Sequence, residues 1–244
     1  MSLPEQLKSG KDKVFRNLVR RLCRRFDGAG GGGGGGAAWS IHAYLDESGA
    51  FDYEQYRQAQ VSANQRKIES VWAQEENIRF LADYLRRTIA NPKFGICHGT
   101  RRGLEQRWFR QYLGCEVIGT EISETATEFP DTIQWDFHET KPEWLNSVDF
   151  IYSNSLDHSY DPERCLNAWV SCLRTSGLLI IEHSADDVEA RESDPFGAQL
   201  AVMPYLVLQW AKGAFSTREI IQAPKSAVVG DKEHACYFLM IRRN

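Results

Sequence analysis

The stretch that decides the fold is FGICHGTRRGLE, residues 94–105, together with VIGTE at residues 117–121. Each begins as a short apolar run. The first run breaks into a loop that holds Gly99 and Gly103, and the second ends in Glu121, 22 positions beyond Gly99. Glycine lets the backbone approach a ligand closely, and a carboxylate accepts hydrogen bonds from ribose hydroxyls. The pair therefore predicts a site for a nucleoside-containing cofactor.

Strand-like and helix-like segments alternate from residue 93 onward. We expect seven strands, at 94–97, 116–120, 132–135, 148–153, 177–182, 219–223 and 235–241. Helices are expected at 103–113, 162–173 and 197–210, the last kinked at Pro204. The final two strands lie close in sequence and are predicted to pair antiparallel. This alternation predicts an α/β fold with a mostly parallel sheet and helices on both of its faces.

The preceding residues are predicted to form an N-terminal helical extension. Apolar residues recur at helical spacing among arginines in 1–27, which indicates a basic amphipathic helix. Residues 28–38, GAGGGGGGGAA, are predicted to be a glycine-rich linker, because ordering each glycine costs backbone entropy. Residues 39–92 are expected to form a helical cap that stops at Pro92. We expect helix 1–27 to dock on its own acidic body or on a second copy, as a homodimer; peripheral contact with an anionic membrane is the alternative.

Composition and charge bound the class of protein. The 244 residues are 42% hydrophobic and 25% charged, as in a packed globular protein. No apolar run approaches the roughly 20 residues that cross a bilayer, and no secretory signal is present, so a cytoplasmic protein is expected, with the inner membrane face as the alternative. Six cysteines without a CxxC pair predict neither disulfides nor zinc. Residues 1–26 carry eight Lys/Arg and two acidic residues, hence +6, which leaves −10 elsewhere from the total of −4 and argues against nucleic-acid binding.

Polar residues follow four of the predicted strands in turn. They are the loop 98–103, then Glu121, then Asp136, and finally the run SNSLDH at 153–158. In open parallel sheets, ligands bind outside the carboxyl ends of the strands. Four such ends in succession therefore predict one shared ligand crevice. The alternative for Asp136 is that it caps the next helix.

From about Gly95 to Asn244 the chain resembles the class I S-adenosylmethionine-dependent methyltransferases. The resemblance implies a Rossmann-like S-adenosylmethionine-binding methyltransferase domain over 93–244. It implies that Gly99 packs against the methionine part of the cofactor and that Glu121 holds the ribose. It also implies that Asp136 contacts the adenine amino group. The predicted cofactor-binding residues are His98, Gly99, Thr100, Arg101, Glu121, Ile122, Asp136, Phe137, Asn154 and Ser155.

The first loop departs from the family pattern. Gly95 stands where the family has an acidic residue, and Cys97 and Arg101 replace two of its glycines. We expect Thr100 and the backbone N–H groups of the loop to take the cofactor carboxylate, with an arginine of the loop as a bidentate partner. Glu105 is interpreted as a first-turn carboxylate that suits the helix dipole.

His158 is the candidate general base, because transfer to a hydroxyl requires removal of a proton and imidazole titrates near neutral pH. Asp157 is predicted to orient it or to raise its basicity. The alternative is that residues 157–159 only cap the following helix, and His98 is a rival base. His183, beside Glu182, could also face the acceptor. Because these residues lack a tight ligand spacing, no metal site is predicted.

The sequence therefore predicts an S-adenosylmethionine-dependent methyltransferase that acts on a small molecule or glycan, at a hydroxyl, by in-line transfer. A sulfonium methyl is already activated, so the protein mainly aligns the reactants and excludes water. No NPPY-like amide-binding motif follows the fourth strand. A nicotinamide-dependent oxidoreductase is the first alternative, disfavoured because the loop after the first predicted strand lacks GxGxxG and no Tyr-x-x-x-Lys pair is present. A non-catalytic cofactor-binding partner protein is the second, which the altered first loop keeps open.

Overall fold

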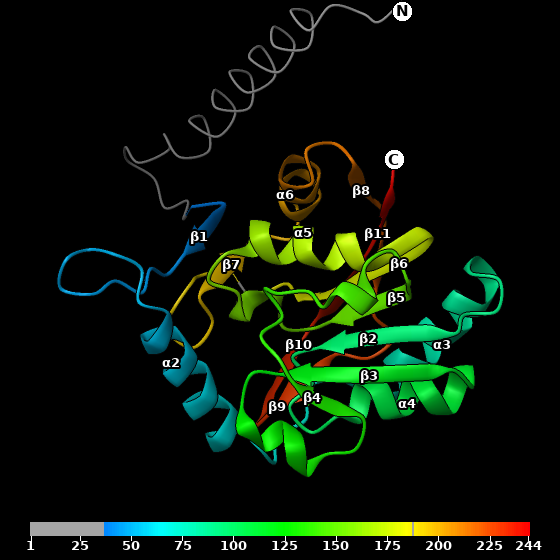
Figure 1. The fold of residues 1–244 in the computed structure, drawn as a ribbon, viewed down its shortest axis with the longest axis horizontal. Helices are drawn as coiled ribbons and strands as arrows, with labels where there is room; N and C mark the ends of the chain where they lie inside the picture. Colours follow the sequence, from blue (N-terminus) through cyan, green and yellow to red (C-terminus); the bar gives the residue numbers. More distant parts are fainter. Residues whose placement is uncertain (1–36, 187) are drawn as a thin grey trace, which may run out of the picture. The chain divides into compact units, whose positions relative to one another are not determined.

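Seven strands form one sheet in the computed structural model, which describes residues 37–186 and 188–244 (Figure 1). In spatial order they are β4 (Thr132–Gln134), β3 (Glu116–Glu121), β2 (Phe94–His98), β5 (Val148–Ser153), β6 (Leu173–Ser184), β11 (Cys236–Arg243) and β8 (Phe215–Gln222). The strands from β4 to β6 are parallel, and β11 is antiparallel to both of its neighbours. The predicted α/β class, with a mostly parallel, Rossmann-like sheet of seven strands, is confirmed.

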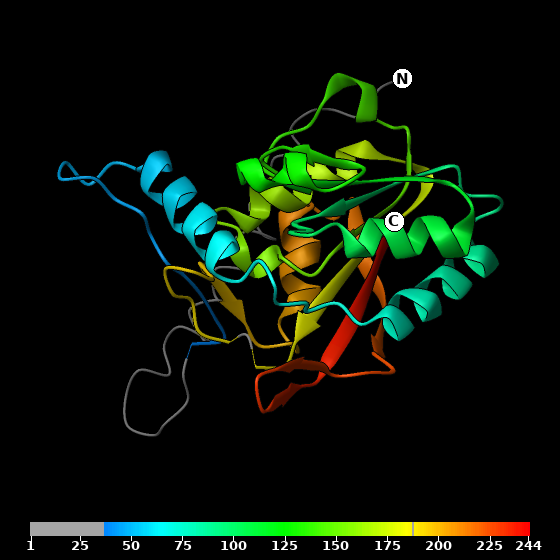
Figure 2. The same cartoon turned by 90° about the horizontal axis from the view of Figure 1, so that it is seen from below.

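Helices cover both faces of this sheet (Figures 1 and 2). One face carries α3 (Glu75–Thr88) and α4 (Leu104–Leu113), and the other carries α5 (Pro162–Cys172) and α6 (Met203–Trp210). The side chains of β5 alternate between the two layers, since Phe150 and Tyr152 pack with α3 and α4 whereas Ile151 packs with α5 and α6. Every residue of β5 is buried, as expected for a central parallel strand.

The remaining elements surround the sheet. They are β1 (Trp39–Ile41), α2 (Tyr53–Arg66), η1 (Glu124–Glu128), η2 (Pro142–Trp144), η3 (Leu156–His158), β7 (Phe196–Ala198), β9 (Ala227–Val229) and β10 (Lys232–His234). β1 pairs with β7, and β9 pairs with β10, in two small antiparallel sheets. In Figure 1, α2 lies beyond the arrowheads of β2 and β3. This places α2 at the edge where a ligand crevice is expected.

Local sequence signals account for the helix ends. Asp52 precedes α2 and accepts a hydrogen bond from the backbone N–H of Gln55 at 3.0 Å. Asp161 caps α5 in the same way, and Pro162 occupies the first turn, where no N–H partner is needed. Gly114 ends α4 with a φ of 67°, a left-handed conformation that glycine adopts without strain.

The predicted helix over 197–210 is wrong in its first half. Gly197 lies in β7, and α6 begins only after a turn. A Cβ atom at Gly197 would lie 2.6 Å from the carbonyl oxygen of Val188, so the backbone is packed there as an extended strand rather than a helix. Pro204 stands in the first turn of α6 instead of kinking it. The strand predicted at 177–182 is longer than expected. It corresponds to β6, which begins at Leu173, directly after α5, and runs to Ser184.

Only part of the predicted N-terminal extension falls within the residues that the structure describes. The predicted basic helix 1–27 and most of the linker 28–38, with the membrane and homodimer contacts expected there, lie outside them. Residues 39–92, expected to be a cap, contain β1 as well as α2 and α3, and α3 packs on the sheet beside α4. Within 37–186 and 188–244, no helix has the length and apolar character that crossing a bilayer requires.

Candidate active site

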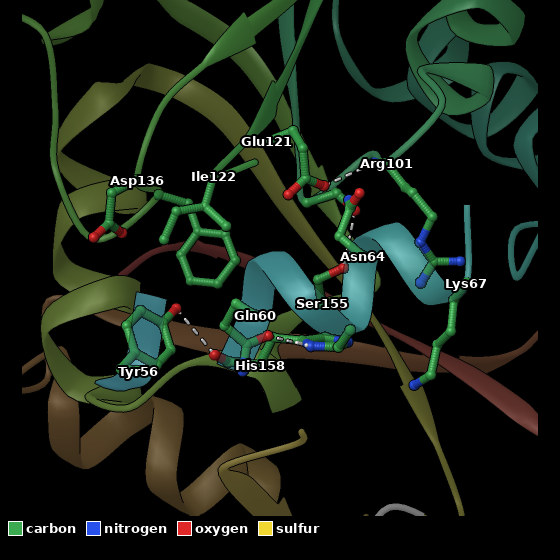
Figure 3. A pocket seen from close by; sticks show the side chains of 13 residues that line it. Tyr56, Gln60, Asn64, Lys67, Arg101, Glu121, Ile122, Asp136, Ser155 and His158 are labelled. Atoms are coloured by element: carbon green, nitrogen blue, oxygen red, sulfur yellow. Dashed lines mark hydrogen bonds between the residues drawn. The ribbon is translucent and has the colours of Figure 1, made fainter. Parts of the chain in front are cut away.

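Two cavities open where the carboxyl ends of β4, β3, β2 and β5 lie side by side. The smaller measures about 50 Å³, and Figure 3 shows its walls. The predicted residues that line it are Gly99, Arg101, Glu121, Ile122, Asp136, Phe137, Ser155 and His158. The larger, of about 520 Å³, adds Thr100, Asn154 and Asp157. All predicted site residues except His98 therefore line one or both cavities.

Close packing explains the glycine of the first loop. Gly99 has a φ of 72°, and a Cβ atom there would lie 2.5 Å from the side chain of Ser155. Only glycine fits both the backbone angle and the space. Arg101 also has a positive φ, 41°, which is rare for a residue with a side chain. The loop is therefore held in an unusual conformation between β2 and the segment after β5.

The loop amides are not free to hold a carboxylate. The N–H groups of Gly99 and Thr100 both donate to the carbonyl oxygen of Thr120, at 2.9 and 3.1 Å. The Thr100 hydroxyl packs against Gly119 and is buried without a hydrogen-bond partner. These two amides therefore already have an acceptor within the protein, whereas the contact of Thr100 with the cofactor carboxylate stays a prediction. Side-chain cations, Arg101 and the nearby Lys67, are the alternatives in the cavity walls.

Glu121 ends β3 with its carboxylate held in place by the backbone. One oxygen accepts the N–H of Arg101 at 3.1 Å (Figure 3). The other accepts the N–H of Ser123 at 3.2 Å. The residue is only 7% exposed, and the exposed part faces the smaller cavity. Each carboxylate oxygen has a second lone pair. Glu121 can thus accept two further hydrogen bonds from a ligand.

Asp136 lies at the other end of the smaller cavity, in a hydrogen-bond chain. It accepts the hydroxyl of Tyr53 at 2.8 Å and the ring Nδ1 of His138 at 2.7 Å. The other ring nitrogen of His138 lies 2.7 Å from the hydroxyl of Ser159. Burial raises the pKa of Asp136, but the hydrogen bonds from His138 and Tyr53 outweigh burial, so this pKa lies below its ordinary value. Asp136 caps no helix.

The order Asp136, His138, Ser159 resembles that of a hydrolytic triad, but its serine is inaccessible. Ser159 has no exposed surface and lines neither cavity. A nucleophile must reach its substrate. The chain of hydrogen bonds instead ties the segment after β4 to the turn that carries His158.

His98 is a core residue, which corrects its predicted contact with the cofactor. β2 extends one residue further than predicted and includes it. Its ring stacks on Trp169 at 4.9 Å, and its Nδ1 lies 2.8 Å from the hydroxyl of Thr120. Burial lowers the pKa of His98 to about 3, so the ring is neutral. It cannot serve as the rival base because it lines neither cavity.

His158 points into both cavities from η3, with one ring nitrogen engaged. Its Nδ1 lies 2.9 Å from Oε1 of Gln60 (Figure 3). The amide nitrogen of Gln60 donates to the carbonyl oxygen of Ser193, so Oε1 is the atom that faces the ring and must accept from it. Neutral His158 therefore carries its proton on Nδ1. Its Nε2 keeps a lone pair.

Two carboxylates face this lone pair. Nε2 lies 3.8 Å from Asp157 and 3.9 Å from Asp194, too far for hydrogen bonds. Burial and then Asp194 raise the pKa of Asp157 to about 7. Burial lowers the pKa of His158, although Asp194 acts in the opposite sense. In the described part of the chain, these three are the one cluster of His, Cys, Asp or Glu with ligand atoms close enough to share a cation.

Further carboxylates line the larger cavity. Glu182 accepts the hydroxyl of Tyr152 at 2.8 Å and the indole N–H of Trp72 at 3.2 Å. Burial raises the pKa of Glu182 to about 6 despite these hydrogen bonds. His183 points away, since neighbouring strand residues face opposite sides of a sheet, and its Nε2 lies 2.9 Å from the carbonyl oxygen of Ala198. His183 therefore lines neither cavity.

Several residues of the site carried little signal in the sequence. Gln60 and Lys67 belong to α2 and the turn after it, and Asp194 precedes a proline in a loop. His138 stands two positions beyond Asp136, and that short spacing was the one local hint of their contact. The rest are brought to the crevice by packing between distant segments.

Comparison with known proteins agrees with this geometry. Residues 96–181 match the model of a methyltransferase domain family. Among solved structures, the chain is similar to 1,6-didemethyltoxoflavin-N1-methyltransferase of Burkholderia thailandensis with bound S-adenosylhomocysteine. The TM-score is 0.59 and the identity 16%, with 84% of this chain and 99% of that chain covered. A search among curated proteins finds no sequence match.

Two other structures show the same fold. The plantazolicin methyltransferase BpumL, in complex with S-adenosylhomocysteine, has a TM-score of 0.56 at 13% identity, with 78% of this chain and 96% of that chain covered. The mitomycin 7-O-methyltransferase MmcR has a TM-score of 0.51 at 12% identity, with 70% and 54% covered. With the family match, the strand order and the crevice at the strand ends, the chain carries a class I S-adenosylmethionine-dependent methyltransferase domain.

Proposed function

We propose that this methyltransferase transfers a methyl group to a hydroxyl of a small molecule or glycan, with His158 as the general base. The observation that carries the proposal is the lone pair on His158 Nε2, which points into the cavities between Asp157 and Asp194. A hydroxyl placed there would donate its hydrogen to Nε2. The two carboxylates would then stabilise the imidazolium that forms.

The residue types that line the smaller cavity suit the adenosyl part of S-adenosylmethionine. Glu121 has lone pairs for the ribose hydroxyls, and Ile122 and Phe137 offer apolar surface to a flat base. Asp136 stands at the rim as an acceptor for an amino group. When bound, the cofactor supplies a methyl group on a positively charged sulfur. The protein has to align it with the acceptor oxygen and exclude water.

Helix α2 would act as the cap of this site. Tyr56, Gln60, Ala63 and Asn64 form one wall of the smaller cavity. The backbone of His158 is tied to the same helix, because the Tyr56 hydroxyl donates to its carbonyl oxygen at 3.2 Å. A movement of α2 would therefore open the cofactor site and shift the base together. This supports the helical cap over residues 39–92 for α2, whereas α3 belongs to the sheet layer.

A small acceptor agrees with the size of the larger cavity, about 520 Å³. Two of the similar structures are methyltransferases named for toxoflavin and mitomycin substrates, which are small molecules. Those substrates belong to those proteins. For this chain the acceptor is proposed only as a compound with a hydroxyl that can reach His158.

A methyl-transfer assay tests the proposal. Purified protein is given S-adenosylmethionine with a labelled methyl group and a panel of hydroxyl acceptors, each paired with its amine counterpart. His158→Ala should lower turnover by about 10²- to 10⁴-fold, the usual contribution of a general base, with little change in affinity for S-adenosylhomocysteine. His42→Ala, a histidine outside both cavities, is the control. If His158→Ala kept full turnover, His158 would not be the base, and residues 157–159 would only form a turn.

Metal removal distinguishes a role of His158 as the general base from a role as a metal ligand. Asp157, His158 and Asp194 have the ligand types of a divalent-cation site. If His158 is the base, treatment with EDTA should leave turnover unchanged. Loss of turnover with EDTA, restored by Mg²⁺ or Mn²⁺, would make these three residues metal ligands instead.

A further inference from the structure

Glu105 is a buried carboxylate that forms no salt bridge within the described part of the chain, although the charge of Arg101 acts to lower its pKa. It lies in the first turn of α4, is 7% exposed, and lines the larger cavity next to the first loop. Its side-chain partner is Asn154, whose amide nitrogen lies 3.4 Å away, a long hydrogen bond. The neighbouring arginines face other groups, since Arg101 donates to the carbonyl oxygen of Ser70 and Arg102 pairs with Glu69.

A helix-dipole role does not account for this burial. A first-turn carboxylate gains its interaction with the dipole while remaining in water, as Glu163 does at the start of α5. Burying a carboxylate is unfavourable, and its own backbone N–H, Asn154 and the charge of Arg101 offset that cost only in part. The cost is visible in its pKa, which burial raises to about 7. A cation from a ligand in the cavity would remove that cost.

The first loop offers no acidic side chain for such a cation. Gly95 occupies the position where related loops carry an acid, and the structure shows why none fits. A Cβ atom at Gly95 would lie 2.3 to 2.8 Å from three ring carbons of Phe150. The acid in this region comes from α4 instead, eleven residues after the start of β2.

We propose that the Glu105 carboxylate, oriented by Asn154, binds the ammonium group on the methionine part of the cofactor. The inference rests on S-adenosylmethionine as the cofactor and is independent of the acceptor. An α-amino acid presents an ammonium and a carboxylate on one carbon. The cavity wall contains both Glu105 and the cations Arg101 and Lys67, so each charge of the amino acid would find an opposite charge there.

Two ligands isolate the ammonium. S-Adenosylhomocysteine carries the amino acid, whereas 5′-methylthioadenosine keeps the adenosyl thioether and lacks it. Affinities of both are measured by titration calorimetry for the wild type, Glu105→Gln and Glu163→Gln. The last is a matched control, a first-turn glutamate on another helix. Glu105→Gln should weaken S-adenosylhomocysteine about tenfold to a hundredfold, as for loss of a charged hydrogen bond. It should change 5′-methylthioadenosine by less than about twofold, and Glu163→Gln should change neither.

Three results would overturn the inference. If Glu105→Gln lowered the affinity for both ligands equally, Glu105 would only shape the loop. If it changed neither affinity, Glu105 would only interact with the dipole of α4. If the wild type bound neither ligand, S-adenosylmethionine would not be the cofactor of this protein. Binding of both without methyl transfer would affect only the proposed base. If Glu105→Gln does not fold, Glu105→Asp withdraws the charge by one methylene and should again weaken S-adenosylhomocysteine selectively.

Discussion

The side chain of Gln60, on α2, fixes the tautomer of His158. Its Oε1 atom lies 2.9 Å from Nδ1 of His158, and its Nε2 atom is held by the carbonyl oxygen of Ser193. The proton is thereby kept on the ring nitrogen remote from the cavity. Helix α2 thus sets the protonation of the candidate base on a turn after β5.

Replacing Gln60 with glutamate should move the pH dependence of turnover. A carboxylate at Nδ1 favours the imidazolium, so the pKa of His158 rises by about one unit. Because the base acts in its neutral form, the acidic limb of the kcat/KM profile should shift to higher pH by that amount. Gln55→Glu adds the same charge to an exposed position of α2 and serves as the control. An unmoved limb would mean that His158 does not accept the proton.

Glu121→Gln should weaken S-adenosylhomocysteine by about 1–3 kcal/mol, the scale for loss of hydrogen bonds to a charged group. Isothermal titration would measure the change, with Glu116→Gln at the exposed start of the same strand as the control. Glu121→Ala should cost additional stability, because the N–H groups of Arg101 and Ser123 lose their acceptor. Unchanged binding in Glu121→Gln would remove this residue from the ribose site.

Gly95→Ala should destabilise the fold by about 1–3 kcal/mol, the usual cost of overpacking a core. The added methyl would overlap the ring of Phe150. The second variant, Gly95→Ala with Phe150→Leu, should recover part of the loss by making space. Urea unfolding of both proteins would test this, and wild-type stability in the single variant would contradict the close contact.

The buried Glu105 should make stability fall as pH rises. Its pKa is 4.5 in an unfolded chain and about 7 here, because burial disfavours the charge. Between these two pKa values the folded protein binds more protons than the unfolded chain does. The stability that Glu105 contributes is therefore fully present below the pKa of the unfolded chain, and it is lost as the pH rises through the pKa of the folded protein. The melting temperature of Glu105→Gln should therefore match that of the wild type near about pH 4 and exceed it near about pH 8. If the melting temperatures of the two proteins differed by the same amount at every pH, the raised pKa of Glu105 would be contradicted.

The strand ends could be predicted because their signals are local. An apolar run followed by a polar residue identifies β3 with Glu121 and β5 with the segment that begins at Asn154, and neither needs knowledge of distant contacts. The same reasoning failed for His98, because one additional strand residue carried it into the core beside Trp169. As a strand residue, His98 falls on the face that packs against α5, because successive side chains of a strand point to opposite faces of the sheet.

The rest of the site depends on packing between segments far apart in sequence. Gln60 and Asp194 meet His158 only after α2 and the loop before β7 have folded against the sheet. Thr100 looked like a hydroxyl for the cofactor, yet Gly119 on the neighbouring strand leaves room for it inside the sheet. Gly197 and Ala198, at the start of the predicted helix 197–210, pair with β1, which lies more than 150 residues earlier in the sequence. No local pattern records such pairings.

The shared acceptor at Thr120 has a consequence for how long the cofactor stays bound. Because the amides of Gly99 and Thr100 already donate to that carbonyl, the carboxylate of a bound cofactor would be left to the long, partly hydrated side chains of Arg101 and Lys67. Attraction of this kind is screened by mobile ions, unlike a cradle of main-chain groups. Ionic strength would then govern the exchange of spent for fresh cofactor between turnovers.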